Sequence, residues 1–151
     1  MAKEVYYKDI KVGDEMPSFT SDPITRTHLV RYAGASGDFN PLHHDNTFVA
    51  LFGLPNVIAH GMLIMGLTGR AVTNWIPQKH LKKYKVRFSG MTDPMDLNDA
   101  ANTTKRATIT VKGKVVKKWE EGKDKLVECE IESADGNGIV KLTGSFVATL
   151  P

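Results

Sequence analysis

The chain has 151 residues, of which 41% are hydrophobic and 25% charged, so it has the length and composition of one globular domain spanning 1–151. Its net charge is +3, but acidic residues are interleaved with most of the lysines, which argues against a nucleic-acid surface and favours a local contact with an anionic group. No stretch is apolar enough to span a membrane, residues 1–6 lack the apolar run of a signal peptide, and the single Cys129 cannot form an internal disulfide, so we expect a cytoplasmic protein.

The first half of the chain predicts a short strand, a helix and a loop. Residues 18–24 fit the strand, and the helix begins at a cap, Thr25 or Thr27, and ends near Gly37. Residues 38–43 then form a loop, because Pro41 disfavours a helical conformation for the residue before it. Asp45 is expected to cap a short segment that follows the loop.

Residues 61–73 predict a second helix that is apolar on almost every side. Such a helix is expected to be covered nearly all round. Gly66 and Gly69 each cost about 1 kcal/mol relative to alanine inside a helix, which predicts that another backbone packs closely against them. Arg70, on the same helix, should need a carboxylate or carbonyl partner.

The second half alternates apolar and polar residues in the manner of strands, over residues 81–88, 107–115, 127–131 and 140–148. In the last of these, Val140, Leu142, Phe146 and Ala148 oppose the polar Lys141, Thr143 and Ser145. Residues 98–106 show no pattern and are expected to be a mobile connection. An antiparallel meander with one apolar face, preceded by an apolar helix, predicts an α+β fold in which the sheet curls around that helix.

Two residues can supply acid-base chemistry, and a third offers a binding site for a negative charge. Asp38 and His43 lie in the predicted loop, and a carboxylate and an imidazole can move protons to and from water near neutral pH. Gly61 begins the apolar helix, where its N–H has no intrahelical partner and can bind an oxygen that carries negative charge. Together they resemble a water-activating pair that faces an anion-stabilising group.

The order of these motifs resembles a known family. Gly-Asp-Phe-Asn-Pro-Leu-His at 37–43, Ala-His-Gly-Met-Leu at 59–63 and Val-Arg-Phe at 86–88 resemble the MaoC-like hydratases and dehydratases of the hot-dog fold, which include (R)-specific enoyl-CoA hydratases. The chain looks most similar to single-domain (3R)-hydroxyacyl-ACP dehydratase subunits of the HadB type. It departs from that family after Val-Arg-Phe, where residues 93–96 read Asp-Pro-Met-Asp in place of a Pro-Gly-Asp turn.

The resemblance implies reversible hydration of trans-2-enoyl thioesters, carried on CoA or ACP, to (3R)-3-hydroxyacyl thioesters without a metal or redox cofactor. It assigns His43 as the main water activator, Asp38 as its partner and Gly61 as the oxyanion donor. Asn40 is expected to hold the loop, and Lys85 and Arg87 are candidates to bind carrier phosphates. The expected assembly is a homodimer, or a heterodimer with a related hot-dog subunit.

Other interpretations remain open at this point. Asp38 can be a turn residue, His43 a structural histidine, and Lys85 and Arg87 part of a solvated strand face. A metal site formed by His43, His44, Asp45 and His60 is disfavoured because their spacing matches no established ligand pattern, and His60 alone is expected to have a structural role at the helix start. As a whole, the chain can instead be a non-catalytic hot-dog subunit. A hot-dog thioesterase would need a carboxylate on the central helix, where residues 61–73 have none.

Overall fold

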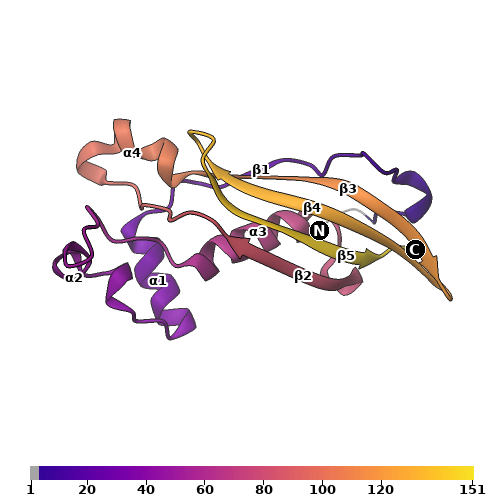
Figure 1. The fold of residues 1–151 in the computed structure, drawn as a ribbon, viewed down its shortest axis with the longest axis horizontal. Coiled ribbons are helices and arrows are strands. Elements are labelled where there is room, and N and C mark those ends of the chain that lie inside the picture. The colour runs from indigo at the N-terminus through magenta and orange to yellow at the C-terminus, as the bar shows by residue number, and fades with distance from the viewer. Residues whose placement is uncertain (1–3) are drawn as a thin grey trace.

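The computed structural model describes residues 4–151; residues 1–3, which begin the segment without a signal-peptide pattern, lie outside the described residues. The five strands form one antiparallel sheet in the order β1-β3-β4-β5-β2 (Figure 1). The elements are η1 (Tyr7–Asp9), β1 (Phe19–Thr20), α1 (Arg26–Ser36), η2 (Pro41–His43), α2 (Asn46–Ala50), α3 (Gly61–Trp75), η3 (Gln78–His80), β2 (Leu81–Phe88), η4 (Leu97–Asp99), α4 (Ala100–Ala107), β3 (Ile109–Glu121), β4 (Asp124–Asp135) and β5 (Val140–Thr149).

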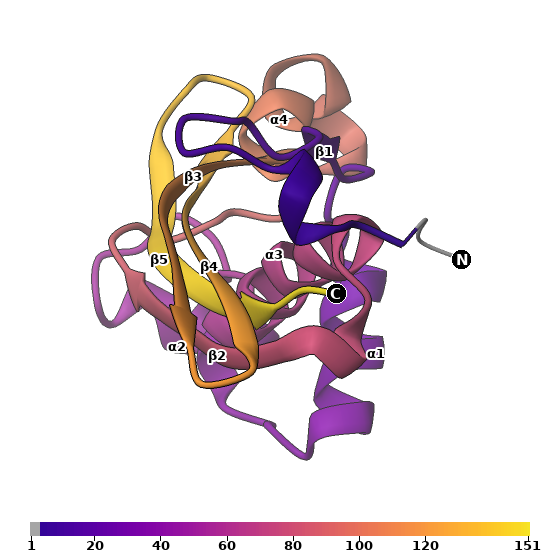
Figure 2. The ribbon, with the colours of Figure 1, turned by 90° about the vertical axis from the view of Figure 1, so that its right-hand side faces the viewer.

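The sheet curves around α3, which lies on its inner side (Figure 2). The alternation of the sequence sets this arrangement, since Val111, Val115 and Phe146 are fully buried on the inner face while Lys112 and Lys114 are exposed on the outer face. Two hydroxyl contacts attach α3 to the sheet: Thr68 Oγ1 lies 2.7 Å from Ser133 Oγ, and the Tyr84 hydroxyl donates to the Met65 carbonyl at 2.8 Å. The expected α+β hot-dog architecture is confirmed.

Two features expected of α3 are not met within the single chain. The sheet covers only one side of the helix in a single chain, so Met62, Gly66 and Arg70 on the other side are exposed. Within residues 4–151, a Cβ at Gly66 would have no neighbour within 4 Å, and one at Gly69 would meet the Tyr84 ring at 3.6 Å, so no backbone of the described chain packs closely against these two glycines. Arg70 forms no ion pair within residues 4–151 but lies over the Phe19 ring, 5.5 Å from its centroid.

Residues 98–106 are helical, which corrects the expected irregular connection. Asp96 accepts from the Asn98 N–H at 2.9 Å and starts η4, and α4 follows directly. Within α4 the Thr103 hydroxyl donates to the Asp99 carbonyl at 2.7 Å. Short polar side chains that bond the local backbone therefore support this segment, and its buried face consists of the small residues Thr103 and Ala107.

A β-bulge interrupts the pairing of β4 with β5. Ser133 pairs with Leu142 and Ala134 with Val140, so Lys141 is an extra residue without a partner in β4. Its side chain is buried, unlike the exposed side chain of Thr143 two residues later. The simple alternation expected for residues 140–148 is therefore wrong at Lys141.

Cys129 lies fully buried in β4, where burial raises the pKa of its thiol to about 12. This environment matches the expectation of an inert core thiol. Across residues 4–151, none of the helices combines the length and the apolar character needed to cross a membrane.

Candidate active site

Asp38 is positioned by the end of α1. Thr25 caps the start of this helix, and Gly37 ends it with a left-handed φ of 74° that glycine adopts without strain. The Asp38 N–H then donates to Ser36 Oγ at 3.2 Å, while its carboxylate Oδ1 accepts from the Asn40 N–H at 3.2 Å. One carboxylate oxygen thus shapes the loop, and the other, Oδ2, faces His43.

His43 lies at the end of η2, and two contacts orient it. Asn40 Oδ1 accepts from the Leu42 N–H at 3.0 Å, which starts η2 and fits the expected loop-holding role of Asn40. His43 Nδ1 lies 2.8 Å from the Ile58 carbonyl oxygen, which can only accept, so Nδ1 carries the proton and the neutral ring keeps its lone pair on Nε2. This Nε2 lies 3.8 Å from Asp38 Oδ2, a separation that leaves the lone pair free for a proton from water.

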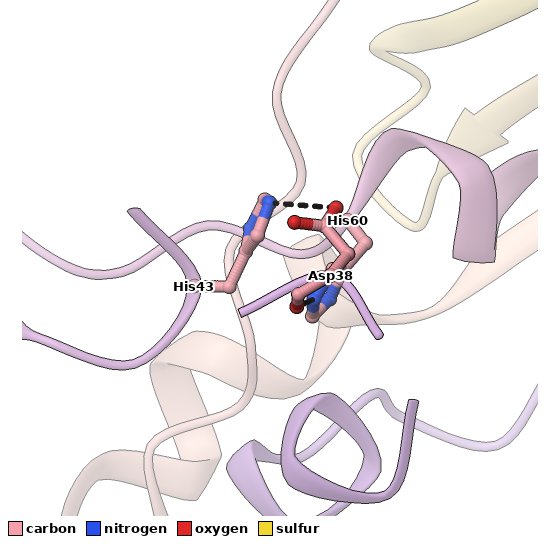
Figure 3. Close-up of side chains that lie close together, drawn as sticks. All are labelled: Asp38, His43 and His60. Carbon is pink, nitrogen blue, oxygen red and sulfur yellow. Dashed lines mark hydrogen bonds and ion pairs between the residues drawn. The ribbon is translucent and has the colours of Figure 1, made fainter. Parts of the chain in front are cut away.

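His60 joins the two predicted residues (Figure 3). Its ring stacks on His43 with 3.7 Å between centroids, and its Nε2 donates to the Asp38 carbonyl at 3.1 Å. The side chain is only 1% exposed, and burial lowers its pKa, so His60 is held neutral. The sequence predicts only a structural role at the helix start; the contact with Asp38 spans 22 residues and has no local signal.

Gly61 and His43 line one cavity of about 170 Å³. Gly61 is the first residue of α3, and within residues 4–151 its N–H has no hydrogen-bond acceptor, as expected at a helix start. A Cβ at Gly61 would lie 3.3 Å from the Phe88 ring, so glycine leaves the space in front of this N–H open. The other lining residues are Ile58, Ala59, Ile64, Phe88, Gly90, Met91, Thr92 and Lys141.

The histidine cluster suits proton transfer better than metal binding. His44 donates to the Phe39 carbonyl at 3.1 Å and Asp45 caps α2, so neither joins His43 and His60 in the way that the metal site considered from the sequence would require. Asp38, His43 and His60 do place one ligand atom each within 4.8 Å of one another. The two rings are stacked, however, and an ion in the plane of one ring lies well outside the plane of the other, where lone pairs do not point.

Lys85 and Arg87 lie apart from this cavity. Both are exposed on the outer face of β2, where Lys85 lines a shallow depression of about 790 Å³ together with residues of β3, β4 and β5. Phe88 follows Arg87 directly and turns toward Gly61. The structure therefore brings together Asp38, Asn40, His43 and Gly61, and leaves the two basic residues at the edge of the sheet.

Comparison with known proteins identifies relatives over most of the chain. The family model of the MaoC like domain matches residues 10–130. The chain is 34% identical to the fatty acid synthase beta subunit hexB of Dothistroma septosporum over 68% of its own length, although it spans only 6% of that protein. It is 38% identical to 3-hydroxyacyl-thioester dehydratase X of Mycobacterium tuberculosis over 44% of its length and spans 23% of that protein.

Among solved structures, a protein described as a MaoC-like dehydratase is similar with a TM-score of 0.81 and 30% sequence identity. The similarity covers 97% of this chain and 42% of that one. The fold around the Asp38–His43 loop is therefore shared with a protein of known structure.

Proposed function

Because this chain belongs to the MaoC-like domain family, as its two loop motifs predict, we propose that it catalyses reversible hydration of trans-2-enoyl thioesters to (3R)-3-hydroxyacyl thioesters. One observation carries the proposal: the lone pair of His43 Nε2 is free beside the Asp38 carboxylate, and His43 lines the same cavity as Gly61, whose N–H has no acceptor within residues 4–151. A dehydratase of hydroxyacyl thioesters among the relatives supports the same substrate class.

In this reaction His43 takes a proton from water, whose oxygen attacks C3 of the enoyl group. Asp38 holds the water and helps to move the proton. The electron pair of the C2–C3 double bond shifts toward the thioester, and the Gly61 N–H stabilises the negative charge on its oxygen. The proton is then delivered to C2, so the elements of one water molecule are added and the thioester stays intact.

The carrier is CoA or ACP, and its phosphates lie outside the 170 Å³ cavity, which holds only the acyl end. Lys85 and Arg87 are proposed to bind these phosphates, since they are exposed on β2 close to Phe88, which lines the cavity. We further propose a cytoplasmic homodimer, or a heterodimer with a related hot-dog subunit. In support, β2 pairs only with β5 within the described chain, and α3 has an open side.

The purified protein alone should convert crotonyl-CoA to 3-hydroxybutyryl-CoA, measured as loss of the conjugated thioester and by chiral analysis of the product. His43→Ala should abolish this reaction. His44→Gln is the matched control, because the glutamine amide can still donate to the Phe39 carbonyl in the same loop.

The same assay separates the alternatives. Release of free CoA thiol would indicate a thioesterase, for which α3 offers no Asp or Glu. Binding of acyl-CoA without turnover, in the presence of correctly folded protein, would indicate a non-catalytic subunit. Formation of the (3S) product would contradict the proposed stereochemistry.

A further inference from the structure

One wall of the catalytic cavity is formed by loop 89–92, which Lys141 of β5 holds through several hydrogen bonds. Residues 90–92 line the cavity. The N–H groups of Ser89 and Gly90 both donate to the Lys141 carbonyl, at 3.0 and 3.2 Å, and Lys141 Nζ donates to the Met91 carbonyl at 2.8 Å. The backbone and side chain of Lys141 thus contact three consecutive loop residues.

The β-bulge explains why Lys141 can make these contacts. As the unpaired residue of β5 it is free to turn its side chain inward, and bulges near active sites commonly redirect a side chain in this way. Its ammonium lies 3.1 Å from Asp135 Oδ2, and the two side chains are only 10% and 1% exposed. Burying an ammonium is costly unless it is paired, so Asp135 keeps Lys141 inside.

The loop also reaches the catalytic histidine. The Thr92 carbonyl accepts from the Ala59 N–H at 2.7 Å, and the carbonyl of the preceding Ile58 accepts from His43 Nδ1. Gly90 shows how closely the loop packs, since a Cβ there would lie 3.0 Å from the Val140 oxygen. A shift of the loop would therefore change both the cavity wall and the support of His43.

We propose that Lys141, paired with Asp135, is a positioning residue that clamps loop 89–92 against β5 and thereby restricts the cavity to short acyl chains. The inference rests on the proposed hydration of enoyl thioesters. A volume of 170 Å³ is below the roughly 300–1,000 Å³ of pockets for drug-sized ligands and suits an acyl chain of about four carbons.

The experiment uses Lys141→Met, which keeps the side-chain length but removes the ammonium, with Lys112→Met on the outer sheet face as control. Amide hydrogen exchange of Gly90 and Ala59, followed by NMR, reports on the clamp without requiring activity. Protection of both amides should fall at least about 10-fold in Lys141→Met and stay unchanged in the control.

Chain-length preference provides the second measurement. The ratio of kcat/KM for crotonyl-CoA to that for trans-2-octenoyl-CoA should exceed about 10 in the wild type and fall about 10-fold in Lys141→Met. Gly90→Ala keeps the ion pair but pushes the loop from β5, so it should lower the same ratio even if Lys141→Met fails to fold.

Unchanged exchange and an unchanged ratio in the folded variants would overturn the clamp. A loss of thermal stability with no change in the ratio of kcat/KM values would show that Lys141 is merely structural, and this result would also overturn the proposal. If the wild type hydrates neither thioester, the proposed function fails, whereas the exchange data still decide whether Lys141 holds the loop.

Discussion

The ring of His60 stacks on the ring of His43 and also donates to the backbone carbonyl of Asp38, so one buried side chain contacts both members of the proposed acid-base pair. The histidine comes from the segment before α3 and the pair from the loop after α1. Burial favours the neutral form of His60, and this preference has a measurable consequence for the stability of the fold.

Stability should fall as the pH drops below about 6.5, the ordinary value for histidine. Burial lowers the pKa of His60 in the folded protein, so the unfolded chain binds a proton in this range and the folded chain does not. The free energy of unfolding should decrease by at most about 1.4 kcal/mol per pH unit from this residue. Urea unfolding between pH 7.5 and 5 measures the slope, which should become shallower in His60→Gln but not in His44→Gln.

Asp38→Asn and His43→Ala should each reduce hydration by at least about 100-fold while the protein stays folded, because each removes a proton-transfer group. The double variant should be little slower than the slower single variant, since the two residues act as a unit. Steady-state kinetics with saturating crotonyl-CoA measure both effects. Turnover close to that of the wild type in either single variant would contradict the assignment.

Gly61→Pro should remove about 2–4 kcal/mol of transition-state stabilisation, mainly as a loss of kcat. Proline lacks the N–H but is tolerated in the first turn of a helix. Gly61→Ala is the control, since it retains the N–H and places a Cβ against the same Phe88 ring. With thermal stability and affinity for a saturated acyl-CoA preserved, an unchanged kcat in the proline variant would rule out Gly61 as the oxyanion donor.

Lys85→Gln and Arg87→Gln should each raise KM for crotonyl-CoA by about 2- to 5-fold without changing kcat, as expected for exposed charge contacts worth up to about 1 kcal/mol. High salt should abolish the difference. Lys123→Gln, in the exposed turn between β3 and β4 and outside the depression that Lys85 lines, should leave KM unchanged. Equal KM values at low salt would remove both residues from the substrate site.

Light scattering at micromolar concentration should give the mass of a dimer. Met62→Glu, on the open side of α3, should weaken the dimer because it places a charge where an apolar partner surface is expected. A folded, active monomer at this concentration would count decisively against the proposed assembly.

The elements with a clear period were predictable from the sequence. α3 extends two residues beyond the predicted end at 73, and β2 matches the predicted range 81–88. The loop between Gly37 and His43 was predictable as well, because glycine and proline determine the conformation of the backbone immediately around them. Asp38 and His43 face one another for the same reason: only four residues separate them.

The parts that escaped prediction depend on contacts far apart in the sequence or on short polar side chains. α4 buries only the small residues Thr103 and Ala107 and has no large apolar side chain, and Asp96 and Thr103 support the segment by hydrogen bonds. Lys141 reads as an outward-facing strand residue until the pairing of Ser133 with Leu142 reveals the bulge. A bulge of one residue cannot be recognised from the alternation of apolar and polar residues along a strand.

The burial of Cys129 makes this protein convenient for spectroscopy. Because burial raises its pKa to about 12 and leaves it unexposed to solvent, the only cysteine of the chain stays protonated at neutral pH and out of reach of a reagent. A cysteine introduced at an exposed site such as Met91 would therefore react with a maleimide dye selectively, in the otherwise native sequence. A fluorophore at that position would report directly on the loop beside the cavity.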